Sequence, residues 1–384
     1  MSGVLEGASS PIILSYSFRR SRGDEFLAFN ANVPLLPASN MKIITGYAAY
    51  SLLGKKYKLS TSFTRDDDTL VVSGGPTPFL FSSMLRIVLD SFDYYVPIKN
   101  RKIKKVKFIN PSIDNVQINP YWIYGDSRFS YQSKITNFSI NENCTKRVHS
   151  TRNINPQEIH KMEREFRPVK DPKQYISKGI LFPSNEDNLR SLPSSVSLDY
   201  NNHVMKFNLG DLIQHMEYDS CNFSAEVLFK LLSSHGSDSK GSWSKSAMVV
   251  RKFITPIIGK GGSFSIVDGS GLSRHDLFST SLLSGIIHSV VERGDANFLD
   301  CLPSPGKGTL RGRLERYKSE DIFAKTGSLG GVACLSGYIK SREVSFSIIV
   351  NNYLGSHKPS LMVDKVLSSF LENNEVILDT AFSN

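Results

Sequence analysis

Residues 37–54 read PASNMKIITGYAAYSLLG, and this stretch decides the fold. Pro37 precedes apolar positions that recur at helical spacing, and Gly54 is a typical stop signal. The pattern predicts a helix that is apolar nearly all round and therefore buried. Ser39 and Lys42 lie three residues apart at its start, so they share one face. In a low-dielectric setting the pKa of a lysine is depressed, which lets it take a proton from a serine hydroxyl.

Position separates this Ser-x-x-Lys pair from three others in the chain. The others begin at Ser237, Ser242 and Ser304 and fall in stretches that read as polar loops, whereas only Ser39 opens a buried helix. The competing interpretation of Ser39 is a helix N-cap, whose oxygen simply accepts a backbone N–H.

A second candidate motif, Ser220-Cys221-Asn222, interrupts an apolar helical pattern that runs from residue 212 to 232. A loop placed there could present a hydroxyl from Ser220 and an amide from Asn222 to a cleft. A plain turn between two helices, with the asparagine bonded to backbone, is the alternative.

The third motif, Lys325-Thr326-Gly327-Ser328, ends a predicted strand. Lys325 and Thr326 offer a cation and a hydroxyl to a carboxylate, and Gly327 lets an extended backbone approach the strand edge. An exposed strand end without function is the alternative. With this strand, further strands at 333–339 and 344–350 and a closing helix over 362–371 favour an antiparallel meander covered by helices, an α+β arrangement. Residues 12–14 and 26–28 also read as strands.

The order Ser-x-x-Lys, Ser-x-Asn, Lys-Thr-Gly is typical of penicillin-binding proteins and class A β-lactamases. Beyond the triplet, the chain resembles the peptidase S13 family, the class C low-molecular-mass penicillin-binding proteins. The likeness extends to 37–42, 268–274, 302–310 and 351–353. It implies a penicillin-binding, β-lactamase/transpeptidase-like fold: an antiparallel sheet flanked by helices, a helical subdomain and a mostly β inserted domain.

Motif spacing places the insert. The first two motifs are 220 − 39 = 181 residues apart and the last two 325 − 220 = 105. The longer gap must hold an extra domain, which the S13 enzymes have and class A β-lactamases lack. We therefore expect a discontinuous catalytic domain at 1–58 and 203–384 and an inserted domain at 59–202. Asp276, where the family usually has Asn, is one departure from the pattern.

The resemblance implies a serine D-alanyl-D-alanine carboxypeptidase or endopeptidase that acts on peptidoglycan stem peptides through an acyl-enzyme and is inhibited by β-lactams. In that assignment Ser39 is the nucleophile, Lys42 the base and Ser220 a proton relay, while Asn222 holds the substrate amide. The substrate's terminal carboxylate is bound, in the same assignment, by the segment Lys325, Thr326, Gly327 and Ser328. A β-lactamase, distinguished by fast deacylation, and a non-catalytic penicillin-fold binding protein are the alternatives. Three intact motifs argue against the last.

The composition argues against several other classes of function. The 46 basic and 36 acidic residues give a net charge of +10, but the basic residues are scattered, which argues against nucleic-acid binding. Neither a Cys-x-x-Cys pair nor His-Glu-x-x-His occurs, so a zinc site has no support in the sequence. The acyl-transfer mechanism that the resemblance implies needs no metal and no cofactor. No membrane span is expected either. The family implies a periplasmic or cell-envelope location, whereas no signal peptide is visible; a missing first stretch or a misassigned start codon would explain the difference.

Overall fold

The structure, a computed structural model, describes residues 12–76, 78, 105–139, 141–143, 197–199, 202–259, 263–353 and 359–376. The chain divides into two compact units: residues 1–52, 213–221 and 247–384 form the first, and residues 53–212 and 222–246 form the second. The second unit thus takes in helical residues beyond the expected insert. Residues 79–104 and 144–196 of that insert lie outside the described residues, so its boundaries stay a prediction.

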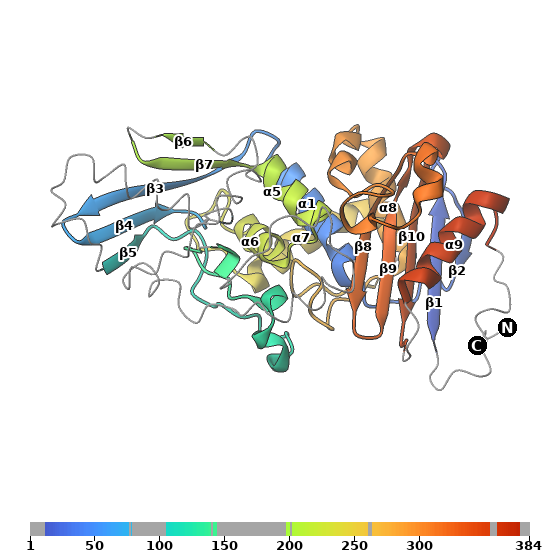
Figure 1. Cartoon of the computed structure of the whole chain (residues 1–384), viewed down its shortest axis with the longest axis horizontal. Helices are drawn as coiled ribbons and strands as arrows, with labels where there is room; N and C mark the ends of the chain where they lie inside the picture. Colours follow the sequence, from blue (N-terminus) through green and yellow to red (C-terminus); the bar gives the residue numbers. More distant parts are fainter. Residues whose placement is uncertain are drawn as a thin grey trace. The chain divides into compact units, whose positions relative to one another are not determined.

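The first unit is built on a five-stranded sheet in the order β2-β1-β10-β9-β8 (Figure 1). All four strand pairs are antiparallel. Its strands are β1 (Ile13–Arg19), β2 (Glu25–Phe29), β8 (Ile322–Leu329), β9 (Val332–Ile339) and β10 (Val344–Asn351). Its complete helices are α1 (Met41–Leu52), α8 (Thr280–Glu292) and α9 (Pro359–Asn373), with short 3-10 turns η1 (Ala38–Asn40), η8 (Ala296–Cys301), η9 (Gly308–Leu310), η10 (Glu315–Glu320) and η11 (Lys340–Arg342).

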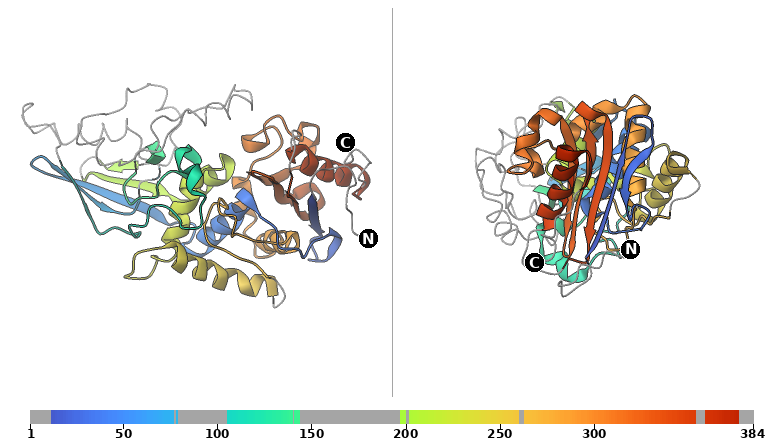
Figure 2. Two further views of the ribbon diagram at one scale, coloured as in Figure 1. Left: turned by 90° about the horizontal axis from the view of Figure 1, so that it is seen from below. Right: turned by 90° about the vertical axis from the view of Figure 1, so that its right-hand side faces the viewer.

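Helices cover both faces of this sheet because strand side chains alternate between faces. From β1, the hydroxyls of Ser15 and Ser17 bond to Thr280 and Ser284 of α8 at 2.7 and 2.6 Å. The neighbouring Phe18 points the other way, toward α9, which lies across the sheet in the right-hand view of Figure 2. The antiparallel meander and closing helix expected from the sequence are confirmed.

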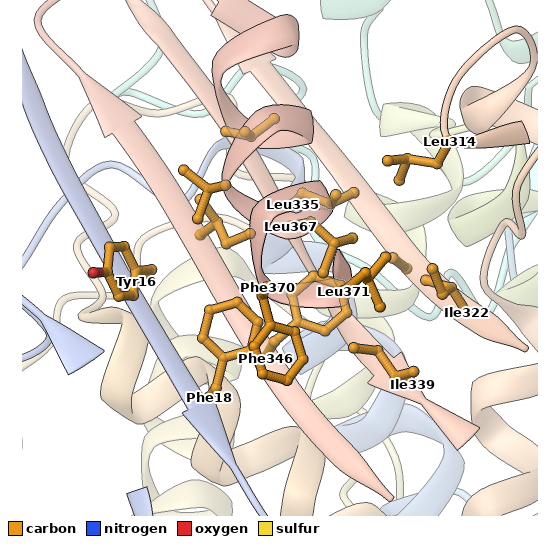
Figure 3. Close-up of a cluster of buried hydrophobic side chains, with 14 of the residues drawn as sticks. Tyr16, Phe18, Leu314, Ile322, Leu335, Ile339, Phe346, Leu367, Phe370 and Leu371 are labelled. Atoms are coloured by element: carbon orange, nitrogen blue, oxygen red, sulfur yellow. The ribbon is translucent and has the colours of Figure 1, made fainter. Parts of the chain in front are cut away.

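The apolar core of the first unit lies between the sheet and α9. Phe18, Phe346 and Phe370 meet there, with the rings of Phe18 and Phe370 4.4 Å apart at their centroids (Figure 3). Val363, Leu367 and the other inward residues of α9 recur at helical spacing. This core includes residues of β8, the strand that carries the Lys-Thr-Gly motif.

The second unit contains a mixed sheet in the order β5-β4-β3-β7-β6. Three of its strand pairs are antiparallel and β4–β5 is parallel. Its strands are β3 (Lys58–Asp66), β4 (Thr69–Gly74), β5 (Lys105–Ile109), β6 (Ser197–Asp199) and β7 (Val204–Asn208). It also holds α6 (Asn222–Leu232) and the 3-10 turns η3 (Tyr124–Arg128), η4 (Ser130–Gln132) and η5 (Asn141–Asn143), while α5 (Leu209–Tyr218) and α7 (Trp243–Ile258) contribute residues to both units.

The break expected in the apolar pattern at 219–222 is present, since α5 ends at Tyr218 and α6 begins at Asn222. Among the described residues, no helix combines the length and apolar character needed to cross a membrane.

Candidate active site

Ser39 lies in the 3-10 turn η1 that leads into α1. Lys42 follows one turn later and is fully buried. Its Nζ donates to Ser39 Oγ at 2.8 Å and to the carbonyl oxygen of Ser270 at 3.1 Å. Ser39 is only half-buried, so it is less enclosed than the lysine beside it. The two residues that the sequence paired are therefore in hydrogen-bond contact.

A loop over residues 268–273 holds the lysine from the other side. The Asp268 carboxylate accepts backbone N–H bonds from Ser270, Gly271 and Ser273 at 3.1, 2.7 and 2.7 Å. Because the carboxylate closes the loop on itself, the Ser270 carbonyl is left facing Lys42. Asp276, the departure from the family pattern, accepts the Val267 N–H at 2.7 Å and so supports the same loop.

Strand β8 packs against η1 and brings the third motif to the serine. Lys325 is fully buried, and its Nζ donates to the Thr326 carbonyl oxygen at 3.1 Å. Thr326 donates from Oγ1 to Thr309 Oγ1 at 2.8 Å. Gly327 is buried, whereas Ser328 is exposed on the strand. The strand thus offers the cation and the hydroxyls that carboxylate recognition needs.

Charge in this region is concentrated on Lys42 and Lys325. Burial and, to a lesser extent, the positive charge of Lys42 lower the pKa of Lys325 to about 7, although Glu217 and Asp219 act in the opposite direction. Two like charges in a low dielectric disfavour each other's ionisation. The arrangement therefore favours one protonated lysine over two.

The second motif is divided between the two units. Ser220, in the first unit, has a left-handed φ of 57°, so the chain turns sharply there after α5. Asn222 belongs to the second unit and begins α6, where its Nδ2 donates to the Tyr131 carbonyl oxygen at 2.9 Å. The roles expected of Ser220 and Asn222 stay predictions.

The other Ser-x-x-Lys pairs lack the buried setting. Ser237 Oγ contacts Ser239 Oγ at 2.9 Å on the surface. Ser242 departs from the expectation of a loop, because it stands just before α7 and its Oγ accepts the Lys245 N–H at 3.3 Å, as an N-cap does. Lys245 is exposed and so lacks the buried setting of Lys42.

Sequence reasoning missed three groups of this site. The Ser270 carbonyl and the Thr309 hydroxyl lie in segments noted for resemblance, but their contacts required the fold. Glu217 carried no motif at all. Its side chain on α5 is fully buried, and burial raises its pKa to about 7 although Lys325 and Lys42 both act to lower it.

A serine bonded to a buried lysine, beside a Lys-Thr-Gly strand on an antiparallel sheet, is the arrangement of penicillin-recognising serine enzymes. A solved structure of penicillin binding protein 4 (dacB) from Haemophilus influenzae has the same fold, with a TM-score of 0.71 and 19% identity over 94% of this chain and 96% of that one. A penicillin G-acylated predatory endopeptidase from Bdellovibrio bacteriovorus, bound to its immunity protein, has a TM-score of 0.54 and 13% identity over 95% and 93%.

The model of the D-Ala-D-Ala carboxypeptidase 3 (S13) family matches residues 18–166 and 204–372, and the chain belongs to this family. The D-alanyl-D-alanine carboxypeptidase DacB of Haemophilus influenzae is 28% identical over 153 residues, which is 38% of this chain and 32% of the relative. The matched regions span only 28% to 39% of the length of three such curated relatives.

Proposed function

We propose that the chain is a serine-type D-alanyl-D-alanine carboxypeptidase or endopeptidase that acts on peptidoglycan stem peptides and is acylated by β-lactams. The observation that carries the proposal is the 2.8 Å hydrogen bond from the buried Lys42 Nζ to Ser39 Oγ. Acyl transfer by a serine requires a base within hydrogen-bond distance of the hydroxyl, and this contact meets that requirement. The named activities of the relatives and the family agree with this chemistry.

The reaction proceeds in two acyl transfers. Lys42, in its neutral form, takes the Ser39 proton as Oγ attacks the carbonyl carbon between the terminal D-alanines. The C–N bond breaks, Ser220 relays the proton held by Lys42 to the leaving amine, and D-alanine departs. Water then attacks the ester carbonyl and gives one of its protons to Lys42, which passes it to Ser39 Oγ as the shortened peptide is released. In a β-lactam the same attack opens the ring, and the amine remains attached.

Recognition rests on the carboxylate that both ligands carry. The Lys325 ammonium and the hydroxyls of Thr326 and Ser328 bind it, and charge-assisted hydrogen bonds of this kind are the strong ones. Asn222 holds the substrate amide. Backbone N–H groups of Ser39 and Ser328 stabilise the oxyanion, and removing one such donor in a related chemistry costs about 3 to 4 kcal/mol of barrier. The substrate places the protein in the cell envelope.

D-alanine release from a synthetic stem peptide ending in D-Ala-D-Ala tests the proposal. We expect release by the wild-type chain and none by Ser39→Ala. The matched control is Ser242→Ala, which removes another serine three residues before a lysine at a helix start and should leave release unchanged. Release that survives in Ser39→Ala would overturn the proposal. Rapid, repeated turnover of penicillin would instead identify a β-lactamase.

A further inference from the structure

Glu217 is a buried acid that the proposed mechanism does not use. It projects from α5 toward α1, where Gly46 lies one turn beyond Lys42. A Cβ at position 46 would sit 2.8 Å from Glu217 Oε1, so the glycine leaves the space that the carboxylate occupies. A glycine in the middle of a helix is unfavourable relative to alanine. Both residues thus depart from what stability alone would select.

The carboxylate has no hydrogen-bond partner among the described residues. An unpartnered buried charge is costly, and an apolar side chain of similar size would be tolerated better. Nearby positive charge compensates the buried carboxylate of Glu217. Lys325 of β8 and Lys42 of α1 both act on it, and Lys325 acts the more strongly. Met216 of α5 and Phe298 of η8 also border the space that a Cβ at position 46 would enter.

The mechanism requires unlike states of the two lysines. Lys42 must be neutral to accept the Ser39 proton, while Lys325 must be charged to hold a carboxylate. Burial and the positive charge of Lys42 push Lys325 toward its neutral form. A negative charge that stabilises the protonated form of Lys325 more than that of Lys42 gives the two lysines the unlike charge states that the mechanism requires.

Resting on the proposed function, we propose that Glu217 is a positioning residue that directs the single positive charge of the lysine pair to Lys325. It thereby keeps the carboxylate-binding cation charged while Lys42 serves as base. Asp219, whose side chain is 55% exposed, adds to the same effect on Lys325 from the end of α5. Water screens that contribution, so it is the weaker one.

The consequence is a dependence on pH with a fixed direction. The pKa of Glu217 is about 7, so the carboxylate is ionised above that pH and neutral below it. Glu217→Gln imitates the protonated form. The variant should therefore match the wild type at pH 5.5 to 6, where Glu217 is neutral. Above pH 7 it should lose activity, because Lys325 deprotonates without its counter-charge.

The experiment measures the second-order rate constant of acylation by a fluorescent penicillin from pH 5.5 to 9.5. An opposite charge at close range typically shifts a pKa by about one unit or more. We expect the alkaline limb of Glu217→Gln to move down by about one unit, which is about a ten-fold loss at high pH. The loss should appear in the affinity for penicillin rather than in the maximal acylation rate. Asp219→Asn should move the limb by less.

The outcomes separate cleanly. A loss of the same size at every pH would show that Glu217 only supports the fold, and an unchanged profile would show that it does nothing for the lysines; either overturns the inference. If the amide variant fails to fold, Glu217→Met, which is neutral and leaves no buried polar group, must show the same shift. Absence of acylation in the wild type would instead overturn the proposed function.

Discussion

Replacing Gly271 by alanine tests how the loop at 268–273 fixes the nucleophile. Gly271 has a φ of +76°, and a Cβ there would lie 1.8 Å from the Ala38 carbonyl oxygen and 2.5 Å from its carbon. Real Cβ contacts stay beyond 3.0 Å, so the two backbones must separate by about 3.0 − 1.8 = 1.2 Å. Ala38 immediately precedes Ser39, and the loop also supplies the carbonyl that holds Lys42.

Two costs follow from this geometry. A left-handed alanine costs about 1 to 2 kcal/mol, and overpacking costs about 1 to 3 kcal/mol. Gly271→Ala should thus lower the free energy of unfolding by about 2 to 5 kcal/mol. Displacing a reacting group by about 1 Å can reduce its rate about 100-fold, and we expect acylation by penicillin to fall by that order.

Gly294→Ala is the matched control. Gly294 has a φ of +74° with nothing within 4 Å of its Cβ position. It should lose only about 1 to 2 kcal/mol in urea denaturation, with no change in acylation. The reasoning is refuted if folded Gly271→Ala acylates within two-fold of the wild type, or if the control loses as much stability as Gly271→Ala.

Two further predictions concern the carboxylate site and the buried acid. Thr326→Val should reduce acylation by about ten-fold or more, since a hydrogen bond to a charged group is worth about 1.5 to 3 kcal/mol. Cleavage of a peptide amidated at its C-terminus should be little affected by this substitution. Equal sensitivity of the acid and the amide peptide to the substitution would show that Thr326 does not contact the carboxylate. The folded-state pKa of Glu217, about 7, lies above its ordinary 4.5, so the folded chain binds more protons between these values and its free energy of unfolding falls as pH rises through them. Glu217→Gln should remove this decrease in the free energy of unfolding. Urea denaturation of the wild type and the variant at pH 5 and pH 7 measures it, and the same change with pH in both proteins would contradict the prediction.

Local patterns were sufficient for the first unit of the fold. The apolar spacing of 37–54 and of 362–371 predicted α1 and α9, and the alternating strands of the C-terminal third predicted β8, β9 and β10. Each of these depends on neighbours within a turn or along one strand. The Ser39–Lys42 contact was predictable for the same reason, because residues three apart in consecutive helical turns share one face.

Long-range contacts escaped the sequence. Glu217 acts electrostatically on Lys42 and Lys325 only because α5, α1 and β8 converge, and no periodicity encodes that convergence. Thr309 reaches Thr326 through the fold alone. The parallel pairing of β4 with β5 was missed as well, since strand direction depends on the path of the connection rather than on the strand's own residues.

Mass mapping of a penicillin adduct tests the central claim most directly. Arg22 and Lys42 bound a tryptic peptide, residues 23–42, in which Ser39 is the single serine. After incubation with penicillin G, the intact chain should gain the mass of one inhibitor molecule, and digestion should place that mass on residues 23–42. Ser39→Ala should remain unmodified. An adduct on residues 241–245, which contain Ser242, or an adduct retained by Ser39→Ala would contradict the account.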